Sequence, residues 1–243
     1  MATKLLEVNS LTKKFGGIFA VYELSFHVEP GESLGLIGPN GSGKTTTFNL
    51  IMRELKQDEG EIYFEGREIS TYQTHERVKM GISRTYQIPR PFSELTVTQN
   101  IRVGILPDAL RQTITLNRRF ADESKIGASV GLTPNDLGMQ PSGLSMGNLR
   151  RLELARTLAT KPKLLLLDEV FAGLTVAEIS ELSELLKHKK AEGLTFIIVS
   201  HDLKTLAPLV DRVVVVNFGQ LIADGSFEDV IANRKVKEAY LGK

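Results

Sequence analysis

The segment GPNGSGKT, residues 38 to 45, restricts what this chain can fold into more than any other stretch of its sequence. The apolar run SLGLI stands shortly before it, and the helical pattern KTTTFNLIMREL starts at its lysine. The segment therefore matches G-x-x-x-x-G-K-[ST] in the strand, loop and helix order that this pattern requires. A loop of this kind indicates a polyphosphate-binding site in an α/β core.

The residue types of this segment explain how a polyphosphate would be held. Its glycines let backbone N–H groups turn inward, and the start of the following helix adds the positive end of its dipole. Lys44 would reach the β and γ phosphates, and the Thr45 hydroxyl would bind Mg²⁺. The predicted nucleotide-binding residues are Gly38, Pro39, Asn40, Gly41, Ser42, Gly43, Lys44, Thr45 and Thr46. A glycine-rich turn with an exposed lysine is the alternative, and the strand and helix flanks argue against it.

A second apolar run, KLLLLDE, brings two acids to the end of a predicted buried strand. Asp168 could hold Mg²⁺ through water and Glu169 could polarise the attacking water, because α/β sheets place ligands at the carboxyl ends of strands. His201 follows the next such strand, in TFIIVSHD, where an imidazole could form a hydrogen bond with a γ-phosphate. Solvated acids and a structural histidine are the alternatives. The phosphate loop favours the functional interpretation.

Three regions of the chain differ in their hydrophobic pattern. The first sixty residues read mostly as short strands, whereas the runs LLLL, TFIIVS and RVVVV predict parallel strands, separated by helices at about 175–191 and 202–209. Between these regions, residues 88–160 are helical in pattern and contain no convincing strand. The fold class is therefore α/β, and the C-terminal run FEDVIANRKVKEAYLGK predicts two short amphipathic helices.

The composition argues against several classes of protein. The formal net charge is +1, from 30 Lys and Arg against 29 Asp and Glu, so no basic excess points to nucleic acid. The absence of cysteine excludes a disulfide framework and favours a cytoplasmic protein. No run approaches the ~18 apolar residues of a spanning helix, and the first residues lack a signal-peptide pattern. Any membrane role is therefore expected to be peripheral, through a partner.

The segment LSMGN, residues 144–148, begins a helical pattern and could be a simple helix start. Ser145 suits an N-cap, whose hydroxyl accepts a hydrogen bond from an early backbone N–H of the helix. Together with the phosphate loop, KLLLLDE and His201, however, the segment resembles part of an ATP-binding cassette ATPase. The resemblance runs from about Leu5 to Lys243, with the elements in the order and spacing of that family.

This resemblance implies an ATP-hydrolysing enzyme with a P-loop NTPase (RecA-like) core, an N-terminal antiparallel β subdomain and an inserted helical subdomain. Residues 1–243 would form one ABC ATPase domain, with the core and β subdomain in 1–87 and 161–243 and the helical subdomain in 88–160. ATP and Mg²⁺ are the implied cofactors. In the family, the pattern LSGGQ faces the γ-phosphate held by the opposite subunit. Ser145 and Gly147 would therefore bind ATP across a dimer, while Met146 and Asn148 depart from the pattern.

The resemblance also implies roles for residues that mean little in isolation. Phe15 matches the aromatic residue that stacks on adenine, and Gln87 matches the glutamine that contacts Mg²⁺ or water between the subdomains. The implied catalytic residues are Lys44, Gln87, Glu169 and His201, and the implied Mg²⁺ ligands are Thr45, Gln87 and Asp168. Val170 and Thr175 stand where Pro and Asp are usual, which bears on communication between the two ATP sites of a dimer.

A narrower resemblance lies in GISRTYQIPRPFSELTVTQNI and in GSFEDVIANRKVKEAYLGK. Both are similar to ATP-binding subunits of branched-chain amino-acid importers, in which the segment matching 105–140 is longer. Systems for urea, amides or lipopolysaccharide are alternatives. The implied partners are transmembrane permease subunits, a second ABC ATPase in a homodimer or heterodimer and, indirectly, a solute-binding protein, with no nucleic acid. The chain would lie in the cytoplasm, peripheral on the cytoplasmic face of the cell membrane.

Three other functions fit part of the sequence. Cassette ATPases of translation usually carry two cassettes and those of DNA repair a long coiled coil, and the sequence has neither feature. A P-loop small-molecule kinase would explain GPNGSGKT and leave LSMGN unexplained. A regulatory partner with weakened hydrolysis in a heterodimer fits Met146 and Thr175, because both lie at interface positions of the family.

Overall fold

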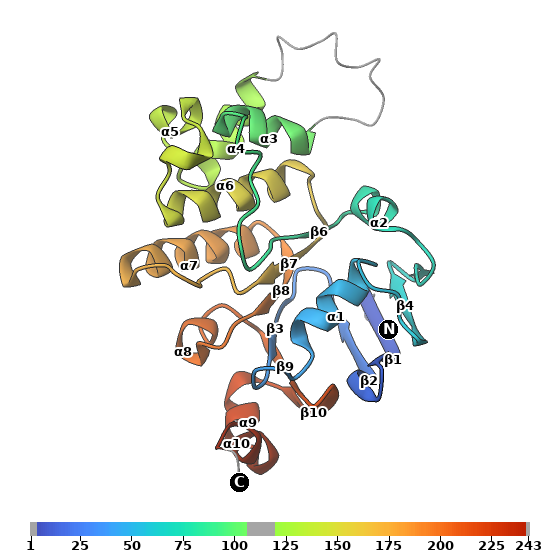
Figure 1. Ribbon diagram of the computed structural model, residues 1–243. Helices are drawn as coiled ribbons and strands as arrows, with labels where there is room; N and C mark the ends of the chain where they lie inside the picture. Colours follow the sequence, from blue (N-terminus) through green and yellow to red (C-terminus); the bar gives the residue numbers. More distant parts are fainter. Residues whose placement is uncertain (1–3, 106–119, 242–243) are drawn as a thin grey trace.

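The computed structural model describes residues 4–105 and 120–241, whose arrangement is shown in Figure 1. Residues 106–119, which belong to the predicted helical subdomain and to the shortened segment 105–140, lie outside the described residues. Helices α3 to α6 gather at one end of the molecule, and the C-terminal helices lie at the other end (Figure 1). The strands occupy the space between them.

The larger sheet has six strands in the order β10, β9, β3, β8, β7 and β6. Its strand β3 (Ser33–Ile37) pairs in parallel with β8 (Thr195–Val199) and with β9 (Arg212–Asn217). On the far side of β8, β7 (Leu164–Asp168) also pairs in parallel with its neighbours. Strands β3, β7 and β8 are buried along their whole length. The prediction of buried parallel strands is therefore confirmed.

The edges of this sheet differ from what the sequence predicts. The three-residue strand β6 (Ile82–Arg84) carries a serine and an arginine, and β10 (Gln220–Gly225) is largely solvent-accessible and antiparallel to β9. Neither has the continuous apolar pattern of the inner strands. The helix predicted at about 202–209 is also shorter in the structure, as α8 (Leu203–Leu206). Pro208 explains this end, because it has no backbone N–H with which to continue the helix after Ala207.

An antiparallel sheet forms the N-terminal part of the chain, as predicted. Its strands run in the order β2 (Ile18–Val28), β1 (Leu6–Phe15), β4 (Glu59–Phe64) and β5 (Arg67–Glu68). A hydrophobic cluster joins this sheet to helix α1 (Lys44–Ile51) and to one face of the larger sheet, through buried side chains such as Leu6, Phe48 and Leu36. The phosphate-loop helix is thus packed between two sheets.

The helices that follow β6 pack against each other and against the second face of the larger sheet. The remaining helices are α2 (Thr74–Met80), α3 (Val97–Ile105), α4 (Phe120–Ser129), α5 (Pro134–Gly138), the 3₁₀ helix η2 (Pro141–Gly143), α6 (Met146–Ala159), α7 (Val176–Ala191), α9 (Phe227–Ala232) and α10 (Arg234–Leu241). Helices α3 and α6 approach so closely that a Cβ on Gly104 would lie 2.4 Å from the Arg156 carbonyl oxygen. We propose that α3 to α6 form the helical subdomain predicted for 88–160. Within the described parts of the chain, no helix is both long and apolar enough to cross a membrane.

Arg77 of α2 joins helix α1 to the chain that follows the antiparallel sheet. Its side chain is fully buried and donates hydrogen bonds to the carbonyl oxygens of Leu50 (2.9 Å), Ile51 (2.6 Å) and Ile69 (2.7 Å). Burial, with a smaller contribution from Arg53, lowers the pKa of Arg77 to about 10. The Leu50 and Ile69 carbonyl oxygens also accept backbone N–H groups, from Arg53 and Tyr72. Arg77 thus adds a charged donor to these carbonyl groups and supplies the side-chain donor of Ile51.

We expect Arg77→Met to lower the stability of the fold strongly. The substitution keeps much of the side-chain volume but removes the charged hydrogen bonds to Leu50, Ile51 and Ile69, which should together cost about 3 kcal/mol. Thermal unfolding followed by circular dichroism would measure the loss. Arg67→Met is the control, since Arg67 is exposed and contacts only the ring face of Tyr72 among the described side chains. Equal unfolding temperatures for the two variants would contradict this account of Arg77.

Candidate phosphate-binding and catalytic site

Three buried parallel strands end at the same edge of the larger sheet. The phosphate loop follows β3, Glu169 follows β7, and His201 follows β8 after one residue. Strand pairing sets their relative positions, since Leu36 pairs with Val199 and Asp168 also pairs with Val199. The sheet therefore gathers the predicted residues at one edge, as in other α/β folds.

The phosphate loop requires glycine because two carbonyl groups press against it. Gly38 has φ 153°, and a Cβ there would lie 2.0 Å from the carbonyl oxygen of Val216 in β9. Gly43 has φ 107°, and a Cβ there would lie 2.2 Å from the carbonyl oxygen of Ala20 in β2. Gly41 also has a positive φ, 77°, but nothing lies near its Cβ position. The loop is thus held between strands of the two sheets.

Lys44 lies inside the loop that it follows. Its ammonium group donates hydrogen bonds to the carbonyl oxygens of Gly38 (2.8 Å) and Pro39 (2.9 Å). Burial lowers the pKa of Lys44, while the nearby carboxylates of Glu169 and Asp168 act in the opposite direction. Thr45 is exposed beside it at the start of α1. A cation and an exposed hydroxyl are therefore available where the loop meets the helix.

Gln87 and Glu169 both belong to the predicted core and are brought together from segments 82 residues apart in the chain. The Gln87 amide donates a hydrogen bond of 2.8 Å to the Glu169 carboxylate. Glu169 has φ 47°, which is unusual for a residue with a side chain, and its N–H donates to the Val199 carbonyl. Such backbone strain is often found at functional sites. The segment that carries Gln87 is itself held by Arg150 of α6, which donates to the Tyr86 and Gln87 carbonyl groups.

The carboxylate of Asp168 is buried and paired with Arg84, which the sequence analysis does not identify. The guanidinium of Arg84 lies 2.6 Å from the Asp168 carboxylate. The signal for Arg84 is weak, because a single arginine in the short strand ISR has no spacing that points to a site. The same is true of Arg150 within the helix NLRRLELARTLA.

Phe15 and His201 are the predicted residues that the described contacts tie least to the loop. Phe15 is 48% exposed at the end of β1, where the Lys13 ammonium lies 5.5 Å from its ring centroid. The hairpin that carries Phe15 approaches the loop through Ala20, as the contact with Gly43 indicates. His201 is exposed, and the next residue, Asp202, caps α8 by accepting hydrogen bonds from two backbone N–H groups. Both side chains are exposed to solvent.

Ser145 and Gly147 lie at the start of α6, apart from the hydrogen-bond network of the loop. The Ser145 hydroxyl accepts a hydrogen bond of 3.1 Å from the Asn148 N–H, which confirms the predicted N-cap. Gly147 lies against α7, since a Cβ there would be 2.4 Å from a carboxylate oxygen of Glu178. Met146 is 45% exposed. A Cβ added to Gly173 would lie 3.9 Å from the side chain of Met146.

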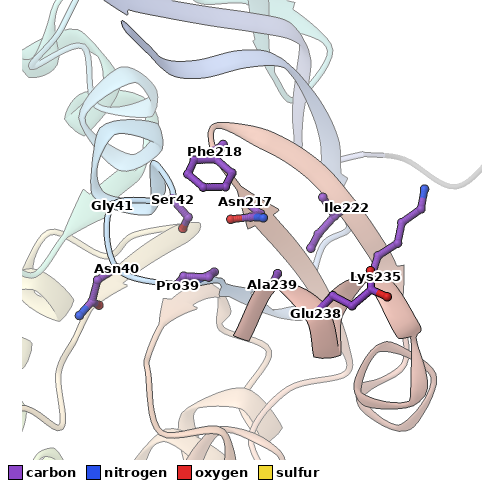
Figure 2. A pocket seen from close by; sticks show the side chains of 10 residues that line it. All are labelled: Pro39, Asn40, Gly41, Ser42, Asn217, Phe218, Ile222, Lys235, Glu238 and Ala239. Atoms are coloured by element: carbon purple, nitrogen blue, oxygen red, sulfur yellow. The ribbon is translucent and has the colours of Figure 1, made fainter. Parts of the chain in front are cut away.

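A pocket of about 550 Å³ opens on the outer side of the phosphate loop. Figure 2 shows the loop residues Pro39–Ser42 facing Phe218, from the β9–β10 turn, and side chains of α10. Phe218 is 81% exposed and has φ 46°. The glycine of NFG is the sequence signal for the turn that carries Phe218.

The oxygen atoms near the loop suit Mg²⁺, which phosphates and water also coordinate, better than a metal ion coordinated by side chains alone. Among the described residues, no group of three or more His, Cys, Asp or Glu side chains could hold a metal ion. Mg²⁺ at phosphate sites needs only one or two protein oxygens, because phosphates and water complete its shell. The Thr45 hydroxyl and the Asp168 carboxylate are such oxygens, so the residues fit that ion.

Comparison with known proteins identifies the family. The family described as "ABC transporter" matches residues 21–172, which is well over half of the 243 residues. This chain belongs to the ABC transporter family. A second family, described as "Branched-chain amino acid ATP-binding cassette transporter", matches residues 220–243. The predicted fold, with its P-loop core, is therefore confirmed, and as an ABC ATPase the chain binds and hydrolyses ATP in transport.

Relatives of this ABC ATPase match it over nearly its whole length. The high-affinity branched-chain amino acid transport ATP-binding protein LivG of Escherichia coli K12 is 35% identical over 255 residues, which cover all of both chains. The lipopolysaccharide export system ATP-binding protein LptB of Haemophilus influenzae is 34% identical over 239 residues, or 98% of each chain. The chain is thus similar in sequence to ATPases of two transport systems.

Solved structures agree with this ABC ATPase in fold. A nucleotide-free ATP-binding cassette from an ABC transporter has a TM-score of 0.88 and 31% identity, over 99% of this chain and 100% of the other. An ATP-binding cassette in its ADP conformation has a TM-score of 0.87 and 32% identity, over 99% of both chains. Each likeness extends over the whole described chain, including both sheets.

We expect Gly38→Ala to damage the fold of the loop far more than Gly41→Ala. Both residues have a positive φ, so each alanine meets backbone strain of about 1–2 kcal/mol. Only the alanine at 38 also collides with the Val216 carbonyl. Thermal unfolding should therefore show a much larger loss for Gly38→Ala, together with loss of ATP binding. Similar losses for both variants would show that the loop yields to the added carbon.

Proposed function

We propose that this chain is the ATP-hydrolysing subunit that energises an ABC importer for branched-chain or other amino acids. The observation that carries the proposal is the match of residues 220–243 to the branched-chain amino-acid family, beside the whole-chain similarity to LivG. An ATPase of a related system for urea, amides or lipopolysaccharide is the alternative, and the similarity to LptB supports it. A regulatory cassette with weakened hydrolysis is a further alternative, which the exposed Met146 supports.

The first step of the proposed mechanism is binding of ATP at the phosphate loop. Backbone N–H groups of Asn40 to Thr46 and the N-terminus of α1 would surround the phosphates. The Lys44 ammonium would exchange its bonds with the Gly38 and Pro39 carbonyls for bonds with the β and γ phosphates. Phe15 would stack on adenine, since its ring is half exposed at the hairpin beside the loop.

The second step is hydrolysis, for which Glu169 would act as the general base. Its carboxylate would accept a proton from water as the water oxygen bonds to the γ-phosphorus and the bond to the β-phosphate oxygen breaks. Gln87 would orient the carboxylate or the water, because its amide already contacts Glu169. His201 would donate a hydrogen bond to the γ-phosphate from the end of β8.

The same residues suggest where Mg²⁺ would be held. Thr45 and Gln87 would supply a hydroxyl and an amide oxygen for it, and the Asp168 carboxylate would hold it through water. Bound there, Mg²⁺ would neutralise charge on the β and γ phosphates. The carboxylates of Glu169 and Asp168 act on the pKa of Lys44, so they lie near this side chain. Because Lys44 would contact the phosphates, this proximity supports the assignment of the metal.

The third step is closure of a dimer with a second ABC ATPase, which is a second copy or a different chain. Ser145 and Gly147 would bind the γ-phosphate held by the partner, with N–H groups from the start of α6. Met146 adds a side chain between them, where close approach favours glycine. Binding of ATP would close the dimer, and hydrolysis would allow it to open.

The proposed permease partner would dock in a groove between the core and α3 and α6. This groove of about 370 Å³ is lined by Arg84 and Tyr86 from the core side and by Val103 and Arg156 from the two helices. It adjoins the segment that carries Gln87, which Arg150 holds in position. Motion in the groove could thus reach Glu169 through Gln87. A solute-binding protein would act indirectly, and the chain would lie on the cytoplasmic face of the membrane.

Uptake by proteoliposomes that contain this chain and its permease subunits tests the proposal. We expect ATP-dependent uptake of leucine or another amino acid, lost with Lys44→Ala and reduced at least about 100-fold with Glu169→Gln, because the base is removed. Lys163→Ala and Glu184→Gln are matched controls, since both side chains form exposed ion pairs elsewhere. Uptake that survives Lys44→Ala would contradict the energising role, and transport of lipopolysaccharide alone would favour the alternative.

We expect Met146→Gly to raise the ATPase rate of the dimer at least about twofold, which corresponds to a small decrease in the activation barrier. Glycine removes the side chain at the surface where the partner's phosphate would approach. Steady-state phosphate release at saturating ATP would measure the change, and ATP binding by the isolated chain should stay the same. An unchanged or lower rate would show that the dimer accommodates Met146 without cost.

A further inference from the structure

Arg84 contacts two carboxylates, one side-chain amide and two aromatic rings. Its guanidinium donates to the Asn49 side-chain oxygen (2.6 Å), to Glu54 (3.0 Å) and to Asp168 (2.6 Å). Its side chain is only 3% exposed, as is that of Asp168. The guanidinium carbon also lies 5.6 Å from the Phe48 ring centroid and 5.0 Å from that of Tyr86. Two rings and three acceptors thus hold Arg84 in one orientation.

A buried ion pair of this kind is poor evidence for a contribution to stability. Desolvation of two charges often outweighs their attraction, and well-packed apolar residues frequently serve as well. The Nε atom of Arg84 is also buried without a hydrogen-bond partner in the described part of the chain. The presence of such a pair therefore suggests a positional role, and Asp168 is the member that the proposed function needs at a defined place.

The contacts of Arg84 continue to the groove through Glu54. One carboxylate oxygen of Glu54 accepts from Arg84, and the other accepts a hydrogen bond of 2.6 Å from the Tyr86 hydroxyl. Burial first, and then Glu54, raise the pKa of Tyr86 to about 12, so its hydroxyl stays a donor. Arg84 and Tyr86 both line the groove. An unbroken series of hydrogen bonds therefore joins a groove residue to Asp168.

We propose that Arg84 is a positioning residue that holds the Asp168 carboxylate for Mg²⁺, and that Glu54 couples this residue to Tyr86 in the groove. The inference rests on the proposed function, which assigns the metal to Asp168. It adds a second connection from the groove to the site. The first runs from Gln87 to the base Glu169, whereas this one ends at a metal ligand.

The strength of ATP binding with and without Mg²⁺ reports the state of Asp168 without any turnover. Arg84→Lys keeps the charge, but one ammonium group cannot reach Asn49, Glu54 and Asp168 in the geometry of a guanidinium. We expect the gain in affinity that Mg²⁺ gives to a non-hydrolysable ATP analogue to fall about tenfold, as for other residues that orient metal ligands. Affinity in EDTA should remain that of the parent, because the phosphate loop is unchanged.

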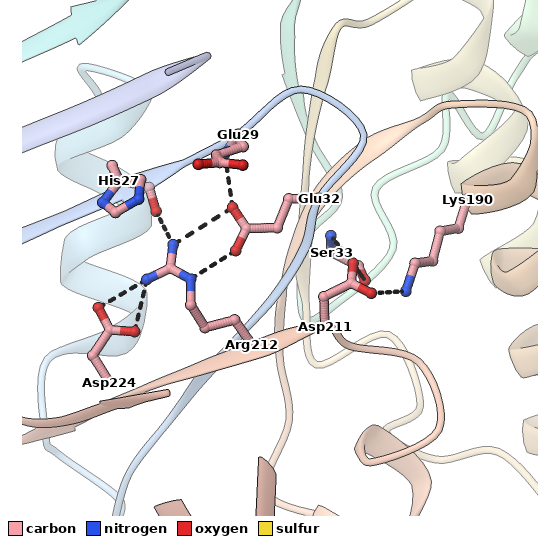
Figure 3. A network of polar contacts seen from close by, with 8 residues as sticks. All are labelled: His27, Glu29, Glu32, Ser33, Lys190, Asp211, Arg212 and Asp224. Atoms are coloured by element: carbon pink, nitrogen blue, oxygen red, sulfur yellow. Dashed lines mark hydrogen bonds and ion pairs between the residues drawn. The ribbon is translucent and has the colours of Figure 1, made fainter. Parts of the chain in front are cut away.

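Arg212→Lys is the matched control for this substitution. Figure 3 shows Arg212 at the start of β9, joined to Glu32 and Asp224 in a separate network of charges. It has the same chemistry as Arg84 and lies at the opposite end of the parallel strands. Arg212→Lys should leave the effect of Mg²⁺ unchanged even if it lowers the unfolding temperature.

Milder variants test the same idea if Arg84→Lys fails to fold. Glu54→Gln and Tyr86→Phe leave the ion pair of Arg84 and Asp168 intact but remove hydrogen bonds that hold Arg84 in place. Each should therefore lower the gain in analogue affinity that Mg²⁺ gives by about twofold to threefold, which is less than the loss typical of residues that contact a metal ligand directly. Because both act through one carboxylate, the double variant should lose no more than the stronger single variant. Fully additive losses would overturn the coupling through Glu54.

The outcomes separate this inference from the function on which it rests. If Mg²⁺ strengthens analogue binding equally in the parent and in Arg84→Lys, the positioning role is wrong and the metal assignment stands. If Arg84→Lys does not fold, an equal effect of Mg²⁺ in the parent and in Glu54→Gln leads to the same conclusion. If Mg²⁺ has no effect in the parent, the metal assignment fails and this inference fails with it. A tenfold loss in Arg84→Lys but not in Arg212→Lys would support the proposal.

Discussion

The close contact between the phosphate loop and two strand carbonyl groups is the constraint on which the site depends. Gly38 approaches Val216 in the larger sheet, and Gly43 approaches Ala20 in the antiparallel sheet. The loop can therefore keep its conformation only while the separation between the two sheets stays the same. Helix α1 begins where the loop ends and packs in the hydrophobic cluster between the sheets. The direction in which the loop N–H groups point is thus a property of the whole core.

The charges around this loop form a second level of organisation. Lys44, Glu169 and Asp168 lie close enough to influence one another, and Arg84 adds a further cation beneath Asp168. The buried Asp168 is paired with Arg84, whereas Lys44 is bonded to backbone carbonyl groups and Glu169 to the Gln87 amide. The partners come from strands, a helix and the segment that enters the helical region. Movement of that region relative to the core would therefore change the balance of charge at the phosphate position.

The sequence alone predicted the parts of the fold that have a simple period or a local rule. The apolar runs of β3, β7 and β8 match strands buried on both faces, and Ser145 follows the rule for helix N-caps. The roles of Phe15, Gln87 and the dimer residues came from resemblance to a family, and they stay predictions. Arg84 and Glu54 could not be found this way, because Glu54 and Asp168 are separated by more than a hundred residues and meet only through the folded sheet. The end of α8 follows a local rule too, because Pro208 cannot continue a helix.

The order of the strands has a consequence for synthesis of the protein. Strand β3 carries the loop, but its neighbours β8 and β9 follow it by about 160 residues or more in the chain. At roughly 5–20 residues per second, a ribosome would need on the order of ten to thirty seconds to make that stretch. During this time the loop sequence exists without the Val216 carbonyl that shapes it. The nascent chain therefore cannot form its mature nucleotide site until most of the polypeptide has left the ribosome, which delays ATP binding until the sheet is complete.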